Sequence, residues 1–365
     1  MESEFYLPIL KAKFGEFTAL SKLTPAIRKH VVPLLVIQPN EYDHQSQIKP
    51  PTMEEHLIKI GSKFKEFWPF DDTFVDTDLV CNESADGLTC IEYLYKRLFE
   101  KGVAPVPVLS LISPDSLKAG VRSVQQKYTI DSCAFRITMN DLSSATLNDR
   151  INLLIVNQLA EVENIHLILD LAAAEFDELD DFADAIVSRL EHFPYWKKWK
   201  SFSICGSAFP KTGAIKEEVN NIPRNEWKLF QLIKEKLDRE KFKRQINYGD
   251  YSIVAPGYIE FDPIRMGSTA NIRYTIDDDY IVLKGKSLKS KGYSQYISQA
   301  IDITNADYFL GAGYSAGDAH LKECADKQIK TGTPTIWNWV GNNHHITKVV
   351  MDLFAKPYVA SYIEE

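Results

Sequence analysis

The stretch "IHLILDLA", residues 165–172, is a short and almost continuous run of apolar residues, interrupted only by His166 and by Asp170 near its end. A run of this length without regular polar alternation is typical of a strand that is buried on both faces of a parallel sheet. Seven other runs of the same kind occur in the chain. They are "FYLPILKAK" (5–13), "VVPLLVI" (31–37), "TFVDTDLV" (73–80), "APVPVLSLI" (104–112), "CAFRITM" (133–139), "SFSICGSAF" (201–209) and "DYSIVAP" (250–256).

Segments with apolar residues at helical spacing lie between these runs, for example "TMEEHLIKIGSKFKEFW" (52–68) and "DDFADAIVSRLEHF" (180–193). Regular alternation of strand and helix predicts an α/β fold with a parallel sheet covered by helices. Eight such units over about 250 residues favour closure into a (β/α)8 TIM-like barrel. The alternative is an open Rossmann-like sheet, but the GxGxxG sequence typical of that fold does not follow the first strand.

The pattern changes after the eighth run. The stretch "ANIRYTIDDDYIVLKGKSL" predicts a β-hairpin insertion at 270–287, before an eighth helix at 293–304. Ser315 and Asp318 have capping-box spacing and predict a helix that starts at Ser315, and a last helix is expected from about Asn343. We expect one domain over 1–365, with barrel units at about 5–305 and a C-terminal extension, 306–365, packed on the barrel.

Composition limits the function classes. A net charge of −8 and a pI near 5.6 disfavour a surface built for nucleic acid, although a local basic groove remains compatible with them. Five scattered cysteines without a CxxC pair indicate neither a disulfide framework nor a thiolate zinc site. The N-terminus lacks a signal-peptide pattern, and no apolar run reaches the length of a membrane span. We therefore expect a cytoplasmic protein without membrane contact.

Four charged residues interrupt the apolar runs: Lys11, Asp76, Arg136 and Asp170. Because buried charges are costly unless they are paired or hydrated, these side chains should converge on a polar cavity at the carboxyl ends of the strands. Structural ion pairs and a ligand or catalytic pocket are equally good interpretations.

Two further charges accompany this group: Lys13 and Asp78 each lie two residues beyond a member of it and should point to the same side. On the pocket interpretation, Asp76, Asp78, Asp170 and Lys11 are the candidate catalytic residues. The carboxylates could bind a divalent cation or act as acid and base, while Lys13 and Arg136 would receive an anionic group.

The predicted hairpin adds Arg273, Tyr274 and Lys284 as candidate ligand-binding residues, because loops after the last strands of a barrel often bind phosphate. A nucleotide or a nucleic-acid backbone would suit them. Ordinary solvated strand charges are the favoured alternative.

His344 and His345 are adjacent, so on a helix they diverge by about 100° and cannot both bind one metal ion. Neither has a histidine partner at helical spacing, and HExxH is absent. At the start of a helix, one would pack inward beside Trp337 or Trp339 and the other would face the rim. They are kept as ligand-binding candidates, although a structural role is favoured.

Several segments resemble the Beta protein family: "YLPILKAKFGEFTALSKL" followed by "VVPLLVIQP", then "RYT", "GYSAGDAHL" and "NHHIT". The family takes its name from a satellite-phage protein encoded beside the Gop and CII proteins in a cassette linked to anti-phage immunity. The matching segments include Lys11, Lys13, Arg273, Tyr274, Ser315, Asp318, His320, His344 and His345. Many relatives carry an acidic residue after "PLL", where this chain has Val36 and Gln38.

The resemblance implies a biological setting rather than a reaction. We expect a barrel component of a prokaryotic anti-phage system that binds a phosphate-containing or nucleic-acid-derived anion, with metal-dependent phosphoester hydrolysis or nuclease activity as one hypothesis. The alternative is a non-enzymatic sensor or antitoxin-like protein that regulates an effector or recognises a phage protein. A second copy of the chain is a further candidate partner.

Overall fold

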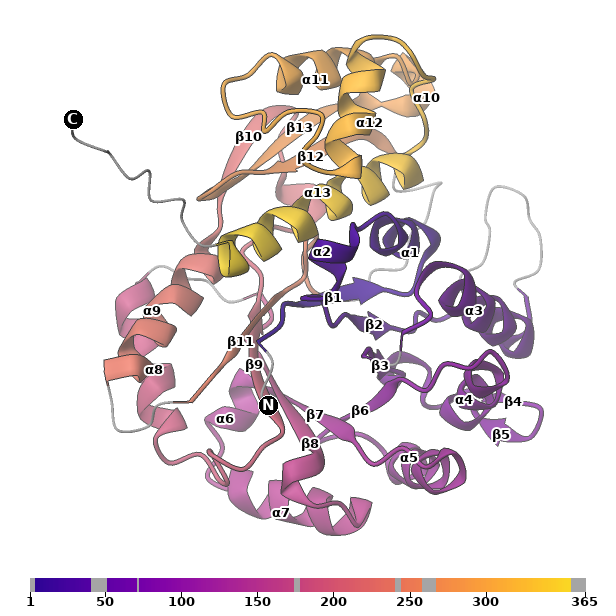
Figure 1. The fold of residues 1–365 in the computed structure, drawn as a ribbon, viewed down its shortest axis with the longest axis vertical. Helices are drawn as coiled ribbons and strands as arrows, with labels where there is room; N and C mark the ends of the chain where they lie inside the picture. Colours follow the sequence, from indigo (N-terminus) through magenta and orange to yellow (C-terminus); the bar gives the residue numbers. More distant parts are fainter. Residues whose placement is uncertain are drawn as a thin grey trace, which may run out of the picture.

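The computed structural model describes residues 4–40, 51–70, 72–173, 178–239, 244–257 and 267–355. Within these ranges eight parallel strands close into a barrel (Figure 1). In order around the barrel they are β1 (Leu7–Lys11), β11 (Asn247–Asp250), β9 (Ser201–Gly206), β8 (Ile165–Asp170), β7 (Cys133–Thr138), β6 (Val106–Ser110), β3 (Phe74–Asp76) and β2 (Leu34–Val36). The first and last of these strands in the chain, β1 and β11, pair in parallel with Leu7 opposite Gly249. The (β/α)8 barrel is therefore confirmed, and the open Rossmann-like sheet is wrong.

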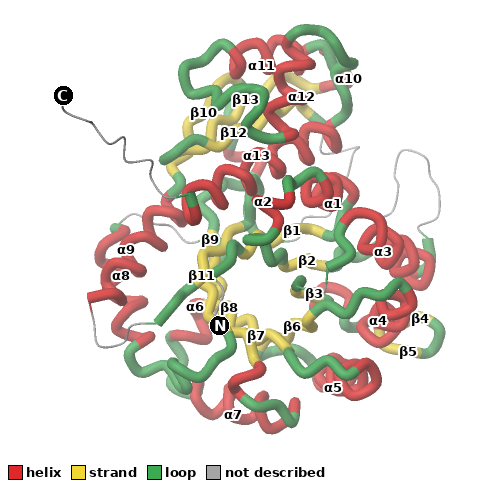
Figure 2. The backbone as a smooth tube through the Cα atoms, viewed as in Figure 1, coloured by secondary structure: helices red, strands yellow, loops and turns green. Residues whose placement is uncertain are grey.

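Helices enclose this ring of strands (Figure 2). Those that follow the first seven strands are α1 (Phe14–Ser21), α3 (Met53–Phe67), α4 (Cys90–Glu100), α5 (Asp115–Tyr128), α7 (Leu147–Gln158), α8 (Leu179–Leu190) and α9 (Asn225–Arg239). Some of these helices begin at capping residues in the sequence. Thr52 and Glu55, for example, form a capping box that satisfies backbone donors at the start of α3.

Shorter elements connect these units. They are α2 (Pro25–Arg28), α6 (Met139–Leu142), the 3-10 helices η1 (Asp78–Val80), η2 (Val162–Asn164) and η3 (Thr212–Ala214), and a small hairpin of β4 (Ser84–Ala85) and β5 (Leu88–Thr89).

Alternate strand side chains fill the inside of the barrel. They form one apolar cluster, whose buried members include Leu7, Ile9, Leu34, Phe74, Val108, Ala134, Ile168 and Cys205. Side chains of the opposite alternation pack outward against the helices in a larger cluster. The interior is so full at β11 that a Cβ atom on Gly249 would overlap Cys205 Sγ and crowd the Leu7 carbonyl oxygen. Glycine is required there by space rather than by backbone conformation.

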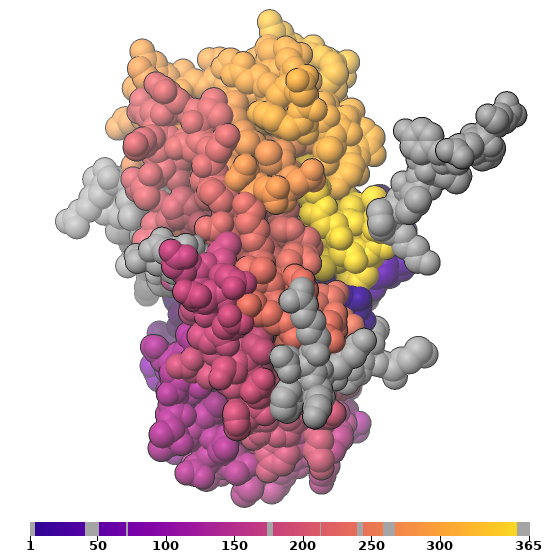
Figure 3. Space-filling view, turned by 90° about the vertical axis from the view of Figure 1, so that its left-hand side faces the viewer, coloured from indigo at the N-terminus to yellow at the C-terminus, as the bar shows by residue number. Residues whose placement is uncertain are grey.

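A second unit, here called the cap, lies beside one side of the barrel. Its elements are β10 (Glu218–Pro223), β12 (Thr269–Thr275), β13 (Asp279–Ser287), α10 (Leu288–Lys291), α11 (Gln295–Thr304) and α12 (Ala316–Ala325). The predicted hairpin is confirmed as the antiparallel pair β12–β13, and β10 adds a third antiparallel strand that the sequence did not indicate. Figure 3 shows the orange cap stacked on the barrel along the long axis of the molecule.

Helix α13 (Pro334–Phe354) joins the two units. Trp337 and Val340, near its start, belong to the apolar core of the cap, whereas Ile346 and Val349 belong to the outer core of the barrel. In Figure 1 its yellow ribbon runs between α9 and α1, and it packs against α1. Helix α13 thus takes the eighth place around the barrel.

Three expectations about these elements were wrong. The eighth strand is 247–250, and residues 251–257 form turns instead of continuing it. The helix expected at 293–304 exists as α11, but its buried residues, such as Tyr296 and Ile303, pack in the cap core. The last helix begins at Pro334, nine residues before Asn343, because Thr333 and Pro334 supply the extended N-cap residue and first-turn proline.

Candidate functional site

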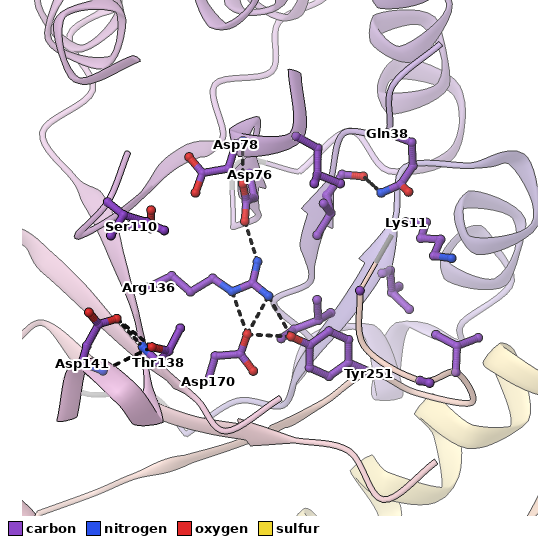
Figure 4. Close-up of a pocket in the computed structure, with 18 of the residues that line it drawn as sticks. Lys11, Gln38, Asp76, Asp78, Ser110, Arg136, Thr138, Asp141, Asp170 and Tyr251 are labelled. Atoms are coloured by element: carbon purple, nitrogen blue, oxygen red, sulfur yellow. Dashed lines mark hydrogen bonds and ion pairs between the residues drawn. The ribbon is translucent and has the colours of Figure 1, made fainter. Parts of the chain in front are cut away.

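Arg136 lies at the centre of a charged group at the carboxyl end of the barrel (Figure 4). Its Nη1 donates to Asp76 Oδ2 at 2.6 Å, and its Nε and Nη2 donate to Asp170 Oδ2 at 3.0 and 2.6 Å. Tyr251 closes the group, since its hydroxyl accepts from Nη2 at 2.8 Å and donates to Asp170 Oδ2 at 2.6 Å. The convergence of strand charges expected from the sequence is present.

The strands explain why these side chains meet. Ala134 and Arg136 are two residues apart on β7, so the guanidinium follows a residue of the inner barrel core and points inward. Asp76 and Asp170 each end a strand. Although burial alone would lower it, the two carboxylates hold the pKa of Arg136 well above its usual range. Arg136 is therefore a permanent cation that neutralises buried carboxylates.

A cavity of about 510 Å³ opens above this ion-paired group. Its polar lining residues are Lys11, Gln38, Asp76, Asp78, Ser110, Arg136, Thr138, Asn140, Asp141, Asp170 and Tyr251. Apolar side chains complete the lining, among them Ile9, Val36 and the exposed Leu79 and Ile112. Nearly all of these residues end a barrel strand or follow one, which is where barrel enzymes place their chemistry.

Asp78 forms one wall of the cavity. It accepts a hydrogen bond from Ser113 Oγ at 2.8 Å, and its backbone N–H donates to Asp76 Oδ1 at 2.9 Å. Desolvation and the nearby charge of Asp76 raise the pKa of the Asp78 carboxyl. Asp78 is consequently suited to hold a proton at the mouth of the barrel.

Lys11 and Gln38 lie on the other side (Figure 4). Gln38 Nε2 donates to the Val36 carbonyl at 3.1 Å, which fixes the orientation of the amide. Its Oε1 is buried and, within the described part of the chain, has no hydrogen-bond partner. Because Gln38 lines the cavity, this unpaired amide oxygen could accept a hydrogen bond from an N–H or O–H group of a bound ligand.

The remaining candidates lie outside this cavity. Lys13 precedes α1 as its N-cap residue, so it no longer shares the strand geometry of Lys11. Arg273 donates to the Ile253 carbonyl and packs over the Phe209 ring, while Lys284 donates to the Ile215 carbonyl. The structure therefore places the hairpin cations against backbone oxygens between the cap and the barrel rather than at the barrel mouth.

The histidine pair is buried within α13. His344 Nδ1 is 2.8 Å from Asp318 Oδ2 and its Nε2 is 2.8 Å from the Thr275 carbonyl oxygen. Tyr274 stacks on His344 with ring centroids 3.8 Å apart and donates to Asp318 Oδ1 at 2.9 Å. Asp318 also accepts a hydrogen bond from Ser315, the confirmed N-cap of α12. His344 and Tyr274 thus hold the cap elements together.

His345 makes the corresponding link to the barrel. Its Nδ1 is 2.9 Å from Thr275 Oγ1 and its Nε2 is 3.0 Å from Asp250 Oδ2, which also accepts from Tyr6 through its other oxygen. Thr275, His345 and Asp250 follow the hydroxyl–imidazole–carboxylate order of a catalytic triad, but the hydroxyl is at Nδ1 rather than Nε2 and all three side chains are buried. The expectation that one histidine faces a rim at a helix start was wrong, since both have 0% exposure in mid-helix.

Metal binding was a hypothesis for the carboxylates of the cavity. Among the described residues, no three His, Cys, Asp or Glu side chains lie together as a metal-binding group. Asp76 and Asp170 instead share the cation of Arg136.

No helix in the described part of the chain is long and apolar enough to cross a membrane.

Sequence reasoning missed Tyr251, Ser110, Thr138, Asn140 and Asp141 as lining residues. Tyr251 was hidden because it was read as part of the eighth strand, whereas it is the first residue after that strand. Ser110 and Thr138 are uncharged, and Asn140 and Asp141 follow an apolar run instead of interrupting it, so no buried charge marks these positions in the sequence.

Comparisons with known proteins identify the family of the chain and show likenesses to solved structures. No curated protein matches the chain. Among solved structures, apo 3-keto-D-glucoside 4-epimerase YcjR from E. coli is similar with 12% identity, over 72% of this chain and 95% of that chain. Its TM-score of 0.31 supports no statement about activity. The family model described as Beta protein matches residues 6–351, nearly the whole chain, and this protein therefore belongs to the Beta protein family.

Proposed function

We propose that this protein is a component of a prokaryotic anti-phage defence system and that its barrel mouth binds a small anionic ligand, phosphate-containing or derived from nucleic acid. The observation that carries the proposal is the polar cavity of about 510 Å³ at the carboxyl ends of the strands. The anti-phage setting comes from the family resemblance.

The geometry suggests how the polar groups divide their tasks. Arg136 is bonded to Asp76 and Asp170, so it positions the floor of the cavity rather than receiving the anion. Lys11 is the other cation among the lining residues and would contact the negative group of the ligand. Gln38 Oε1 would accept a hydrogen bond from a donor elsewhere on the same ligand.

Asp78 supplies the reactive proton if the ligand is a phosphoester. Its raised pKa lets the carboxyl act as a general acid. Water would add to phosphorus, the P–O ester bond would break, and Asp78 would give its proton to the leaving oxygen. The proton released by the attacking water would pass to solvent.

The test uses two isosteric changes, Asp78→Asn and Lys11→Met, with Asp149→Asn and Lys101→Met as controls on exposed positions. Protection is measured as phage plating efficiency in a host that carries the defence locus. Ligand binding is measured as the thermal shift with inorganic phosphate, mononucleotides and short oligonucleotides. The proposal requires that both site variants lose protection and that Lys11→Met also loses the ligand-induced shift. Full protection by both folded site variants would overturn it.

A non-enzymatic sensor or antitoxin-like regulator is the second candidate. It is favoured by the rim of the cavity, where Ile112 is 82% exposed and Leu79 is 43% exposed, and by the engagement of two carboxylates in ion pairs. In that case Ile112→Ser should abolish protection, Asp78→Asn should preserve it, and a pull-down from infected cells should recover a stable effector or phage protein only with the wild-type rim.

A further inference from the structure

A second cavity, of about 380 Å³, lies at the opposite end of the barrel. Asp131 and Asn164, which line it, come shortly before β7 and β8, so it opens beside the amino ends of these strands. Its other lining residues come from the second half of α5, from the last residue of α7 and from the residues that follow each helix: Arg122, Gln125, Gln126, Thr129, Ile130, Gln158, Leu159, Ala160 and Glu161. Because catalysis in such barrels occurs at the other face, this cavity is independent of the proposed function.

Two of the glutamine side chains that line this cavity hold their amide groups in a fixed orientation. Gln125 Nε2 donates to the Ser132 carbonyl at 3.3 Å, and Gln158 Nε2 donates to the Lys118 carbonyl at 3.4 Å. Rotating either amide would place oxygen against oxygen, so each Oε1 must point away from those carbonyls. Both Oε1 atoms are buried, and within the described residues neither has a hydrogen-bond partner. Gln158 as a whole is only 5% exposed.

The groups around these oxygens create a negative electrostatic potential. Helices α5 and α7 both end at the cavity, and each terminates in a left-handed residue, Thr129 or Leu159. The carboxyl end of a helix carries about half a negative charge. Asp131 and Glu161 add two carboxylates. Arg122, the cation among the lining residues, donates to the Asn157 carbonyl at 2.6 Å and so already caps the end of α7.

The rim offers an apolar surface next to these acceptors. Leu159 lines the cavity and is 78% exposed, and Val156, one turn earlier on α7, is 67% exposed. Exposed apolar side chains beside a polar recess can cover the alkyl stem of an amphipathic ligand.

We propose that this cavity binds an organic cation, an ammonium or guanidinium group on an alkyl stem. The cation would donate hydrogen bonds to Gln125 Oε1 and Gln158 Oε1, the two helix ends and Glu161 would stabilise its charge, and Leu159 would cover its stem. Such a group is carried by free polyamines and by the lysine and arginine side chains of proteins. This site would give the barrel a regulatory or partner contact remote from its mouth.

The test is calorimetric titration of the full chain with two probes, spermidine and N-acetyl-arginine methylamide. The double variant Gln125→Met/Gln158→Met removes both acceptors at similar side-chain volume, and Glu161→Gln removes a charge without changing shape. Gln245→Met and Glu163→Gln are matched controls, because neither residue lines the cavity. Unfolding midpoints establish that each variant is folded.

We expect saturable binding of at least one probe, weakened about tenfold or more in the double variant and unchanged in the controls. Glu161→Gln should weaken binding less, and it keeps the test decisive if the double variant does not fold. Preference for spermidine would identify a free polyamine as the ligand, and preference for the arginine derivative would identify a protein side chain. Absence of saturation by both probes up to about 10 mM, or equal binding by wild type and both cavity variants, would overturn the proposal.

Discussion

His345 on α13 is bonded to Asp250 on β11, with 3.0 Å between Nε2 and Oδ2, and both side chains are buried. A helix near the C-terminal end of the chain is thereby tied to the last strand of the barrel. Removing one partner would leave the other buried without its hydrogen bond.

A double-mutant cycle with His345→Gln and Asp250→Asn tests this link. Each single change should lower the free energy of unfolding by about 1–3 kcal/mol. The double variant should lose less than the sum, with a coupling energy of about 0.5–3 kcal/mol, because the two side chains are in contact. Urea denaturation provides the measurement. Strict additivity would show that the observed distance carries no energetic coupling.

The pH dependence of stability should change in Glu226→Gln. Burial raises the pKa of Glu226 to about 7, so the folded protein holds a proton that the unfolded chain has lost, and stability falls as pH rises from about 4.5 to 7.

The buried histidines act in the opposite direction. Burial lowers the pKa of His345, so as pH drops below about 6.5 the unfolded chain binds a proton before the folded protein does, and stability falls. His166, with its pKa lowered by burial to about 3, acts in the same direction as His345.

In wild type these effects oppose each other between pH 5 and 7. In Glu226→Gln the contribution of Glu226 is removed, while the histidines and the other buried carboxyl groups with raised pKa values, such as Asp78, still titrate. The free energy of unfolding should therefore rise more steeply, or fall less steeply, with pH over this range than it does in wild type. Denaturation midpoints at pH 5, 6 and 7 decide the matter. Parallel profiles for the two proteins would contradict the assignment of Glu226.

Arg136→Met should destabilise the barrel by about 3 kcal/mol, because Asp76 and Asp170 would remain buried without a cation. Adding Asp76→Asn and Asp170→Asn should recover much of the loss, since the buried charges are then gone. Lys322→Met is the control, as its exposed pair with Asp326 contributes at most about 0.5 kcal/mol. If the triple variant is no more stable than Arg136→Met, desolvated carboxylates are not the cause.

Gly249→Ala should destabilise the protein by about 1–3 kcal/mol, because its Cβ would overlap Cys205 and crowd the Leu7 carbonyl oxygen. Gly313→Ala is the matched control, as a Cβ there meets no atom within 4 Å. Thermal unfolding of the two variants should therefore differ clearly. Equal midpoints would mean that β11 shifts at little cost.

The barrel and its charged centre were predictable because two simple periodicities apply to them. Apolar runs followed by helical segments define parallel strands, and charges two residues apart share a face. Arg136, Asp76 and Asp170 interrupt otherwise apolar strands, so their convergence followed from the need to pair buried charges.

The rest could not be read in this way because it depends on contacts between distant segments. Strand β10 has a polar sequence and an exposed or half-buried pattern, so it forms only because β13 offers an edge. Helix α13 is buried on nearly every side from Trp339 to Val350, so it lacks the apolar stripe that marks a surface helix. Its start at Thr333 and Pro334 was nevertheless visible as a local signal.

The position of α13 has a consequence for synthesis of the chain. All eight strands leave the ribosome before this helix does, and more than eighty residues separate Asp250 from Pro334. At about 5–20 residues per second, the nascent barrel waits several seconds or longer with a gap between α9 and α1. During that interval the outer face of β11 and β1 is uncovered. The cap elements β12 to α12 are translated next, and α13, which covers this face, follows them. The wall of helices around the barrel should therefore be completed only after α13 has been translated.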